Sequence, residues 1–491
     1  MNNLLKRLNI DYLLVCCTNK YLSEYPLLSE NARYTLTGFT GSTGDALITS
    51  DNIYLFVDGR YHIQADSEAR ENITVIKLQI GQTQDNEIKK IIDRNKILGI
   101  VSKKVSQKRL ESFNGYNIKL LDTDPINDYT EPHIISGEIA FAPVDYKPYA
   151  TFISNPEEVS YITGLRDFSR DNTSKIWSKL YINGNERRLF NNDEECKKFL
   201  SDYNNELIVD KSSINAYDYA LIKQPIHKPS EVRLMKSIKS NEELSAYQEA
   251  FNRTDKTIMA IREFIDNNDN LSEHDIAEKL HEEYLKFGAK SLSFNSIVAI
   301  NQNSAQAHYA KSSKDVILKD GDLVLIDSGA YYESGLATDI TRVFVKGNPS
   351  ELQKNVYTMV LKAFLNCFSL FNRKVTGIEI DTHAHQILDN AINGFSFNHG
   401  LGHGIGINVH ENPPSLSQTE LGNAELLDGM CFTIEPGLYN PKQFGVRLEN
   451  SCYRKDGETH SFVKMGYESK LINYNLLTTE EQKWLKGFNV L

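Results

Sequence analysis

Five residues in the C-terminal part of the chain have the types and the settings of metal ligands: Asp327, Asp339, His403, Glu435 and Glu449. Each lies among Gly, aromatic or alternating apolar residues, a context typical of strand ends and tight turns. Four carboxylates and one imidazole are too many for one transition metal, and they suit two adjacent divalent ions that share oxygen ligands. Since paired divalent ions activate water in many hydrolases, this set predicts a hydrolase.

The two aspartates belong to strands that we expect to form one hairpin. The segment LVLID (323–327) is nearly all apolar, which is typical of a strand buried on both faces, and it ends in Asp327. A carboxylate at that depth is costly unless it is paired or bound to a metal. After a turn over residues 331–335, the alternating segment TDITRVF (338–344) returns and brings Asp339 toward Asp327. Either aspartate alone could cap a turn, but the two together favour a shared site.

Three histidines lie in the glycine-rich segment NHGLGHGIGINVH (398–410), namely His399, His403 and His410. The glycines disfavour a helix, and the glutamate of the helical HExxH zinc motif is absent. In an extended chain His399 and His403 share a face, so both can point into one cleft. A further histidine, His308, follows a predicted strand at its exposed end.

The two glutamates end or begin further predicted strands, MCFTIE (430–435) and FGVRLEN (444–450), which a Pro- and Gly-containing loop joins. Glu435 and Glu449 can therefore approach each other across a hairpin, as the aspartates do. Arg447 lies two residues before Glu449, on the same strand face. It either forms a salt bridge with the carboxylates or positions a substrate or ligand, and the sequence leaves both roles open.

The bulk properties exclude several classes of protein. The chain has 491 residues, of which 40% are hydrophobic and 24% charged, with a net charge of −11. An acidic chain argues against a nucleic-acid partner, and no apolar run approaches the ~20 residues of a membrane span. No signal peptide is predicted. Six cysteines without metal or redox spacing are typical of reduced core residues in a cytoplasmic protein.

Changes in pattern along the chain divide it into three expected domains. Residues 1–125 alternate short apolar strands with polar, helix-like stretches, which predicts an α/β domain. A segment rich in Pro, Asp and Glu opens a second α/β domain over 126–225. In 226–491, Ser240 and Glu243 have the form of a capping box before an amphipathic helix, and strands that carry the candidate chemistry follow.

These segments together resemble the pita-bread family of dinuclear metallopeptidases, and within it the three-domain Xaa-Pro aminopeptidases (aminopeptidase P). The resemblance implies two creatinase-N-like α/β domains followed by a pita-bread catalytic domain, and a homodimer. It spans nearly the whole chain, and the segments that carry it are ITSDNIYLFVDGRYHIQA, NSAQAHY, IDSGAYY, TDITR, HGLGHGIGINVHE, TIEPGLY, VRLEN and SKLINYNLLTTEEQKWL.

By position, the resemblance implies that Asp339 and Glu449 bridge both ions, that Asp327 completes one site, and that His403 and Glu435 complete the other. Its implied reaction is attack by a hydroxide held between the ions on the bond before a proline in second position, with Glu435 as the proton acceptor. The mostly oxygen ligand set favours Mn²⁺, with Co²⁺, Zn²⁺ or Fe²⁺ as alternatives.

The resemblance also implies roles for residues around the ions. His308 and His410 fall at substrate-handling positions with a part in catalysis, and His399 falls at the wall of the pocket for the substrate proline. Arg447 and Tyr439 fall at supporting positions that contact ligands or substrate.

One departure from the family pattern concerns the aspartates. The family usually separates them by eleven residues, whereas Asp327 and Asp339 are twelve apart. One extra turn residue or a β-bulge accounts for the difference and puts the hairpin register in question. The middle domain is also short for the three-domain form.

Two other functions stay open at this stage. A prolidase would cleave only Xaa-Pro dipeptides, and the sequence has no clear extra basic residue to bind their C-terminal carboxylate. A pita-bread domain reused as a non-catalytic binding scaffold would be expected to have lost at least one ligand, and all five are present.

Overall fold

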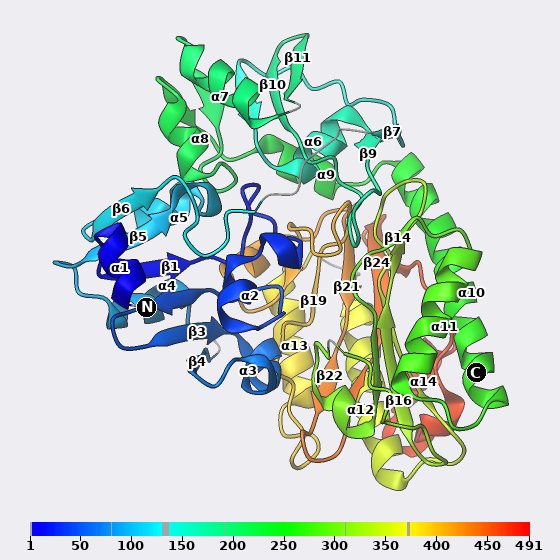
Figure 1. The fold of residues 1–491 in the computed structure, drawn as a ribbon. Helices are drawn as coiled ribbons and strands as arrows, with labels where there is room; N and C mark the ends of the chain where they lie inside the picture. Colours follow the sequence, from blue (N-terminus) through cyan, green and yellow to red (C-terminus); the bar gives the residue numbers. More distant parts are fainter. Residues whose placement is uncertain (1, 80, 130–136, 191, 310, 371–373) are drawn as a thin grey trace. The chain divides into compact units, whose positions relative to one another are not determined.

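A computed structural model describes residues 2–79, 81–129, 137–190, 192–309, 311–370 and 374–491 (Figure 1). By their internal contacts these residues form two units. Unit 1 comprises Met1–Leu165 and Ile176–Val232, and unit 2 comprises Arg166–Lys175 and Arg233–Leu491. No helix in the described ranges is long and apolar enough to cross a membrane.

The first part of unit 1 is a six-stranded mixed sheet in the order β4-β3-β2-β1-β5-β6. Its parallel pairs β1–β5, β5–β6 and β3–β4 are typical of an α/β domain, as the sequence predicted. The strands are β1 (Tyr12–Val15), β2 (Ala46–Ile48), β3 (Ile53–Val57), β4 (Ile73–Lys77), β5 (Ile97–Val101) and β6 (Asn117–Leu121). The helices are α1 (Asn2–Leu8), α2 (Ala32–Thr37), α3 (His62–Glu68), α4 (Gln84–Ile91) and α5 (Gln107–Ser112).

The second part of unit 1 has its own five-stranded sheet in the order β11-β10-β8-β12-β13. The strands are β8 (Thr151–Ile153), β10 (Lys179–Asn183), β11 (Glu186–Phe190), β12 (Leu207–Val209) and β13 (Pro225–His227), with helices α6 (Pro156–Thr163), α7 (Asp193–Asp202) and α8 (Ala216–Leu221). The expected limit at residue 225 falls inside β13, and the division between units falls after Val232 within α9 (Glu231–Ser237).

Unit 2 is built on an antiparallel sheet in the order β15-β16-β18-β24-β21, to which β25 adds by pairing with β24. The strands are β15 (Ile297–Ile300), β16 (Leu323–Ser328), β18 (Ile340–Val345), β21 (Cys431–Ile434), β24 (Glu449–Lys455) and β25 (Glu458–Ser461). The main helices are α10 (Asn241–Asn267), α11 (Glu273–Lys286), α12 (Glu351–Ser369), α13 (Gly377–Leu388) and α14 (Thr479–Leu485). The predicted capping box of Ser240 and Glu243 starts α10.

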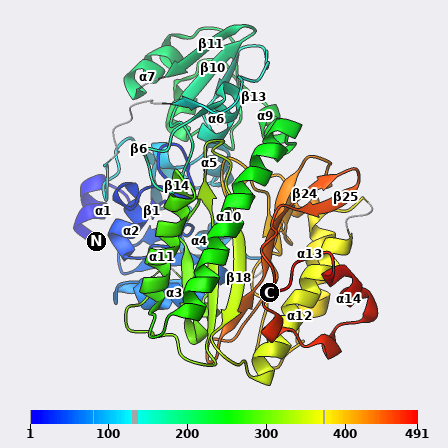
Figure 2. The same cartoon turned by 90° about the vertical axis from the view of Figure 1, so that its right-hand side faces the viewer.

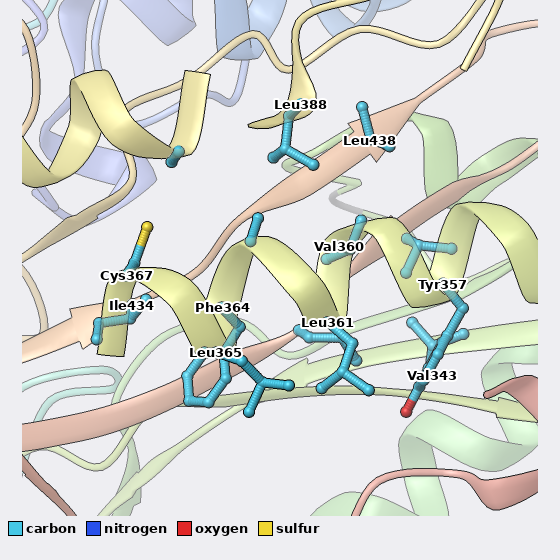
Figure 3. Close-up of a cluster of buried hydrophobic side chains, with 14 of the residues drawn as sticks. Val343, Tyr357, Val360, Leu361, Phe364, Leu365, Cys367, Leu388, Ile434 and Leu438 are labelled. Carbon is cyan, nitrogen blue, oxygen red and sulfur yellow. The ribbon is translucent and has the colours of Figure 1, made fainter. Parts of the chain in front are cut away.

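The two faces of this sheet pack against different helices (Figure 2). On one face Phe344 of β18 lies under the guanidinium of Arg262 from α10, at 5.4 Å. On the other face Leu325 and Val343 join a buried cluster with the α12 side chains Val360, Leu361 and Phe364 (Figure 3). Because strand side chains alternate between faces, Asp327 lies on the same face as Leu325, beyond the apolar cluster.

The packing of α12 predicts which of its side chains stabilise unit 2. Phe364 is fully buried in the cluster, so Phe364→Ala should lower the free energy of unfolding by about 3–5 kcal/mol. Leu352 on the same helix is 38% exposed, and Leu352→Ala should cost less than about 0.5 kcal/mol. Urea unfolding followed by circular dichroism compares the two variants, and equal midpoints would contradict this packing.

Candidate metal centre

The five predicted ligands lie on one face of the unit 2 sheet, in two neighbouring rungs of its ladder. In the first rung Thr341 of β18 is opposite Asp327 of β16 on one side and Glu449 of β24 on the other. The pairing of β21 with β24 ends at Ile434 and Asn450, so the next position of the same register sets Glu435 opposite Glu449. One rung therefore carries three of the four carboxylates.

The second rung lies two residues along each strand and therefore on the same face. Asp339 precedes β18, and its carbonyl oxygen accepts a hydrogen bond from Ser451 Oγ of β24 at 2.8 Å. Ser451 is paired with Thr433 of β21, whose Oγ1 accepts from the amide of His403 at 3.1 Å. His403, in β19 (Gly402–His403), thus joins the rung from beyond β21.

The side chains converge as well as the strands. One ligand atom each from Asp339, His403 and Glu449 lie within 4.8 Å of one another. His403 Nε2 is 3.6 Å from both Asp339 Oδ2 and Glu435 Oε1. These separations leave room for a cation between the atoms without a direct hydrogen bond among them.

The ladder also explains the twelve-residue separation of the aspartates. The pairing of β16 with β18 is unbroken over six consecutive pairs, from Leu323 with Val345 to Ser328 with Ile340. The described ladder therefore has no bulge, and Asp339 is a diagonal neighbour of Asp327 on the same face. The intervening loop absorbs the length, with Gly335 at a φ of 64° and its amide donating to the Tyr332 carbonyl.

Local contacts orient the imidazole of His403. Its Nδ1 is 3.0 Å from the Gly404 carbonyl oxygen, so the proton resides on Nδ1 and the Nε2 lone pair faces the carboxylates. This is the tautomer that a metal ligand requires. The strand can approach β21 closely because residue 402 is glycine: a Cβ there would overlap the Thr433 carbonyl oxygen.

Arg447 forms the salt bridge that the sequence left as one of two options. The residue is 2% exposed, and its Nη2 donates to Asp327 Oδ2 at 2.6 Å. Its Nη1 donates to Tyr439 OH at 2.8 Å, and that hydroxyl is 2.7 Å from His399 Nε2. Burial raises the pKa of Tyr439 to about 12, so the phenol keeps its proton. His399 Nδ1 donates to the Gly400 carbonyl at 2.8 Å, so its Nε2 accepts the hydrogen bond of the Tyr439 hydroxyl. Arg447 and Tyr439 lie on paired strands, β23 (Gly445–Arg447) and β22 (Gly437–Tyr439).

The second arginine of the motif segments has a different place. Arg342 lies on the opposite sheet face from Thr341, and its guanidinium donates to the backbone carbonyls of Glu449, Met465 and Gly466. Within the described ranges no salt bridge joins Arg342 to the four carboxylates, so Arg447 is the arginine that offsets their charge.

The carboxylates are short of positive charge and of hydrogen-bond donors. Burial, followed by the neighbouring carboxylates, raises the pKa of Asp339 and of Glu449 well above the ordinary range. Three buried oxygens of this carboxylate group have no hydrogen-bond partner among the described residues: Asp327 Oδ1, Asp339 Oδ1 and Glu449 Oε1. Such orphaned oxygens are costly, and divalent cations would supply their missing partners. The donor set therefore fits hard or borderline metal ions.

Thr341 is a functional residue that the sequence reasoning missed. Its hydroxyl donates to Glu449 Oε2 at 2.7 Å and accepts from Arg447 Nε at 3.2 Å. Thr341 thus orients both the Glu449 carboxylate and the Arg447 guanidinium. The available signal was its position two residues after Asp339 on an alternating strand, which implies the same face.

The remaining histidines occupy neighbouring loops. The ring centroid of His410 lies 4.4 Å from that of His403, in an edge-on arrangement. His308 is half-buried in the loop after η4 (Asn301–Ala305), which Ser304 ties to β23 through two hydrogen bonds with Gly445. The structure thus places His410 beside a candidate ligand, and it places the loop of His308 beside the strand of Arg447.

Comparison with known protein families gives two matches. Residues 245–455 match the model of metallopeptidase family M24, and residues 1–128 match that of the creatinase/prolidase N-terminal domain. The fold implied by the resemblance, creatinase-N-like followed by pita-bread, is thereby confirmed, and the carboxylates and His403 all lie inside the first match.

Several curated proteins are similar over nearly their whole length. A probable Xaa-Pro aminopeptidase P of Coprinopsis cinerea is 26% identical over 100% of this chain and 93% of its own. Xaa-Pro aminopeptidase 1 of Dictyostelium discoideum is 26% identical over 99% of this chain and 91% of its own. An Xaa-Pro dipeptidase of Pyrococcus horikoshii is 38% identical, but over 45% of this chain and 60% of its own.

A solved structure has the same fold. The crystal structure of an X-prolyl aminopeptidase from Caenorhabditis elegans, described as a cytosolic enzyme with a di-nuclear active site, matches with a TM-score of 0.84. The match covers 97% of this chain and 90% of that one at 20% identity, so it establishes the likeness of fold.

The raised carboxyl pKa values predict that metal binding releases protons. Without metal, Asp339 and Glu449 hold protons at pH values above their ordinary pKa values of 3.8 and 4.5, and a cation must displace them. Metal affinity should therefore rise with pH from the ordinary carboxyl pKa values up through the raised pKa values of Asp339 and Glu449. The metal-free protein, which binds more protons folded than unfolded, should lose stability over the same interval as the pH rises.

Calorimetric titration with Mn²⁺ in two buffers of different ionisation enthalpy measures the released protons directly. Glu449→Gln removes one titrating group and should reduce the release. Binding without proton release would contradict the raised pKa values of Asp339 and Glu449. A chain that bound no divalent metal would favour a non-catalytic scaffold.

Proposed function

Since residues 245–455 match metallopeptidase family M24 and residues 1–128 match the creatinase/prolidase N-terminal domain, we propose that the chain is a dinuclear-metal Xaa-Pro aminopeptidase. It removes the N-terminal residue from peptides whose second residue is proline. The observation that carries this proposal is the set of three orphaned carboxylate oxygens on the sheet face toward which His403 Nε2 points. The full-length similarity to aminopeptidases P supports the choice of substrate.

In this proposal Asp327, Asp339, His403, Glu435 and Glu449 would hold two divalent ions. Asp339 and Glu449, which lie at the centre of the two rungs, would contribute to the binding of both. Mn²⁺ is the proposed metal because oxygen ligands predominate. When bound, the ions supply Lewis acidity that makes a water nucleophilic near neutral pH.

The other groups of the site move protons and orient the substrate. Glu435 is the most exposed of the cluster, with 19% of its side chain accessible, and it accepts the proton of the attacking water. His410, stacked edge-on against His403, donates a hydrogen bond to the oxyanion that develops on the scissile carbonyl. His308 contacts the substrate from the loop beside β23.

Proline is selected by shape, because the Xaa-Pro bond has no N–H to recognise. His399 contributes the wall of the ring pocket, with the Phe397 ring 4.9 Å away and the Tyr439 ring 5.5 Å away. The hydrogen bond from Tyr439 fixes the tilt of the His399 ring. Arg447 completes this relay and so couples the proline pocket to Asp327.

The wider organisation follows the same proposal. Residues 1–125, 126–225 and 226–491 form three domains, of which the first two contribute no chemistry of their own. The enzyme is a cytoplasmic homodimer. The buried state of all six cysteines supports a reducing compartment.

A prolidase is the second candidate, because a Pyrococcus horikoshii Xaa-Pro dipeptidase is 38% identical over 45% of this chain. The two activities differ in peptide length. With Mn²⁺ added, the chain should hydrolyse Xaa-Pro-Xaa tripeptides with a kcat/KM at least about tenfold above that for Xaa-Pro dipeptides. Product analysis by mass spectrometry checks this, and turnover of dipeptides alone would assign a prolidase instead.

Glu435→Gln tests the proton acceptor. The variant should lower kcat by about 10²- to 10⁴-fold while KM for an Xaa-Pro-Xaa peptide changes little, because the amide cannot take the proton. Glu458→Gln, at an exposed position on β25, is the matched control and should keep the native rate. Metal content measured on both variants separates loss of the base from loss of an ion. A near-native rate for Glu435→Gln at full metal content would exclude Glu435 as the base.

A further inference from the structure

A second buried cluster of charges lies in unit 2, next to the loop that joins two of the site's histidines. It consists of Lys236, Lys239 and Glu411, which are 3%, 6% and 2% exposed. Lys239 Nζ is 2.9 Å from Glu411 Oε1, and Lys236 Nζ is 3.2 Å from Glu411 Oε2. Each carboxylate oxygen therefore has its own ammonium partner, which fixes the rotation of the carboxylate as well as its position.

Glu411 closes the loop over residues 404–411 on itself. Its amide donates to the Gly404 carbonyl at 2.8 Å, and its Oε2 accepts from the amide of Ile407 at 2.8 Å. The carboxylate also fills the space beside Gly406, where a Cβ would overlap it. This loop begins directly after His403 and ends directly after His410, so Glu411 sets the distance between the two imidazoles.

The lysines connect this loop to the strand that carries Glu435. The amide of Lys239 donates to the Gly429 carbonyl at 2.8 Å, and Ile238 pairs with Met430, the residue directly before β21. Lys239 Nζ also donates to the Lys236 carbonyl at 2.6 Å. One rigid junction therefore fastens both the histidine loop and the strand of the proposed base.

Stability alone does not require charges here. Taking ammonium and carboxylate groups out of water is costly, and well-packed apolar residues of similar volume often stabilise a fold as well or better. The directional hydrogen bonds of the cluster supply geometry instead. That geometry acts on the loop that carries His410, where a shift of about 1 Å would move the imidazole off the reacting carbonyl.

We infer that Lys236, Lys239 and Glu411 are positioning residues that hold His410 against His403 in the orientation needed for hydrolysis. The inference rests on the proposed function, in which His410 contacts the developing oxyanion. It assigns no contact with substrate to the three residues themselves, which act through the loop.

A double-mutant cycle between Glu411→Gln and His410→Ala tests this. Glu411→Gln keeps the size and the acceptor oxygen but removes the charge that holds both lysines. It should lower kcat for an Xaa-Pro-Xaa peptide about ten- to hundredfold, with KM within about threefold of native. In the His410→Ala background the same change should cost less than about twofold, because the residue acts through His410. Equal losses in the two backgrounds, or no loss in either, would overturn the inference.

Glu468→Gln is the matched control for removal of a buried, ion-paired glutamate. Glu468 is 1% exposed and lies 2.7 Å from Arg262, the residue that packs on the sheet face opposite the carboxylates. Its removal should cost stability but leave kcat unchanged in both backgrounds. Should Glu411→Gln fail to fold, Lys236→Met replaces it in the cycle, since Lys239 still pairs with Glu411 there.

Hydrogen exchange followed by mass spectrometry supplies a readout that does not depend on activity. The amides of 404–411 should exchange at least about tenfold faster in Glu411→Gln than in the native chain, and at the native rate in Glu468→Gln. A native chain that hydrolysed no Xaa-Pro peptide would refute the proposed function, and hydrogen exchange alone would then test whether Glu411 orders the loop. Unchanged exchange of the 404–411 amides in Glu411→Gln would overturn the inferred positioning role.

Discussion

Asp327, Asp339, Glu435 and Glu449 lie on one sheet face, where burial and the neighbouring carboxylates raise the pKa of Asp339 and of Glu449. Arg447 offsets one of these charges through Asp327, and three carboxylate oxygens are left without partners in the described residues. A fold that retains such a group needs further positive charge, which divalent cations would bring. The unit 2 sheet, its glycines and its surrounding loops can be understood as the means of keeping this group together.

The sheet accomplishes this through its register. Antiparallel pairing sets side chains of neighbouring strands directly opposite each other, so three strands deliver Asp327, Thr341 and Glu449 to a single rung. A slip of one residue would turn every one of these groups to the other face. The apolar cluster with α12 makes such a slip unfavourable, because Leu325 and Val343 lie on the same face and would leave the core.

Much of the order in this candidate metal centre comes from residues other than the candidate ligands. Thr341 and Arg447 orient carboxylates, Tyr439 orients His399, and Glu411 closes the loop between His403 and His410. Each of these groups is itself buried and hydrogen-bonded, which limits its motion and transmits the stiffness of the core to the reacting atoms. The two sheets of unit 1 have no comparable cluster of ligands among the described residues.

The sequence by itself predicted the candidate ligands, their placement on strands and the two kinds of domain, because these depend on local pattern: apolar runs, alternation, glycine spacing and a capping box. It also indicated that one hairpin brings Asp327 and Asp339 together. Only the tertiary structure decided the register that accommodates their twelve-residue separation, the role of Thr341 and the pairing of Glu411 with Lys236 and Lys239. These features depend on which residues of distant segments become neighbours in the fold. The local sequence pattern of each segment does not specify its neighbours.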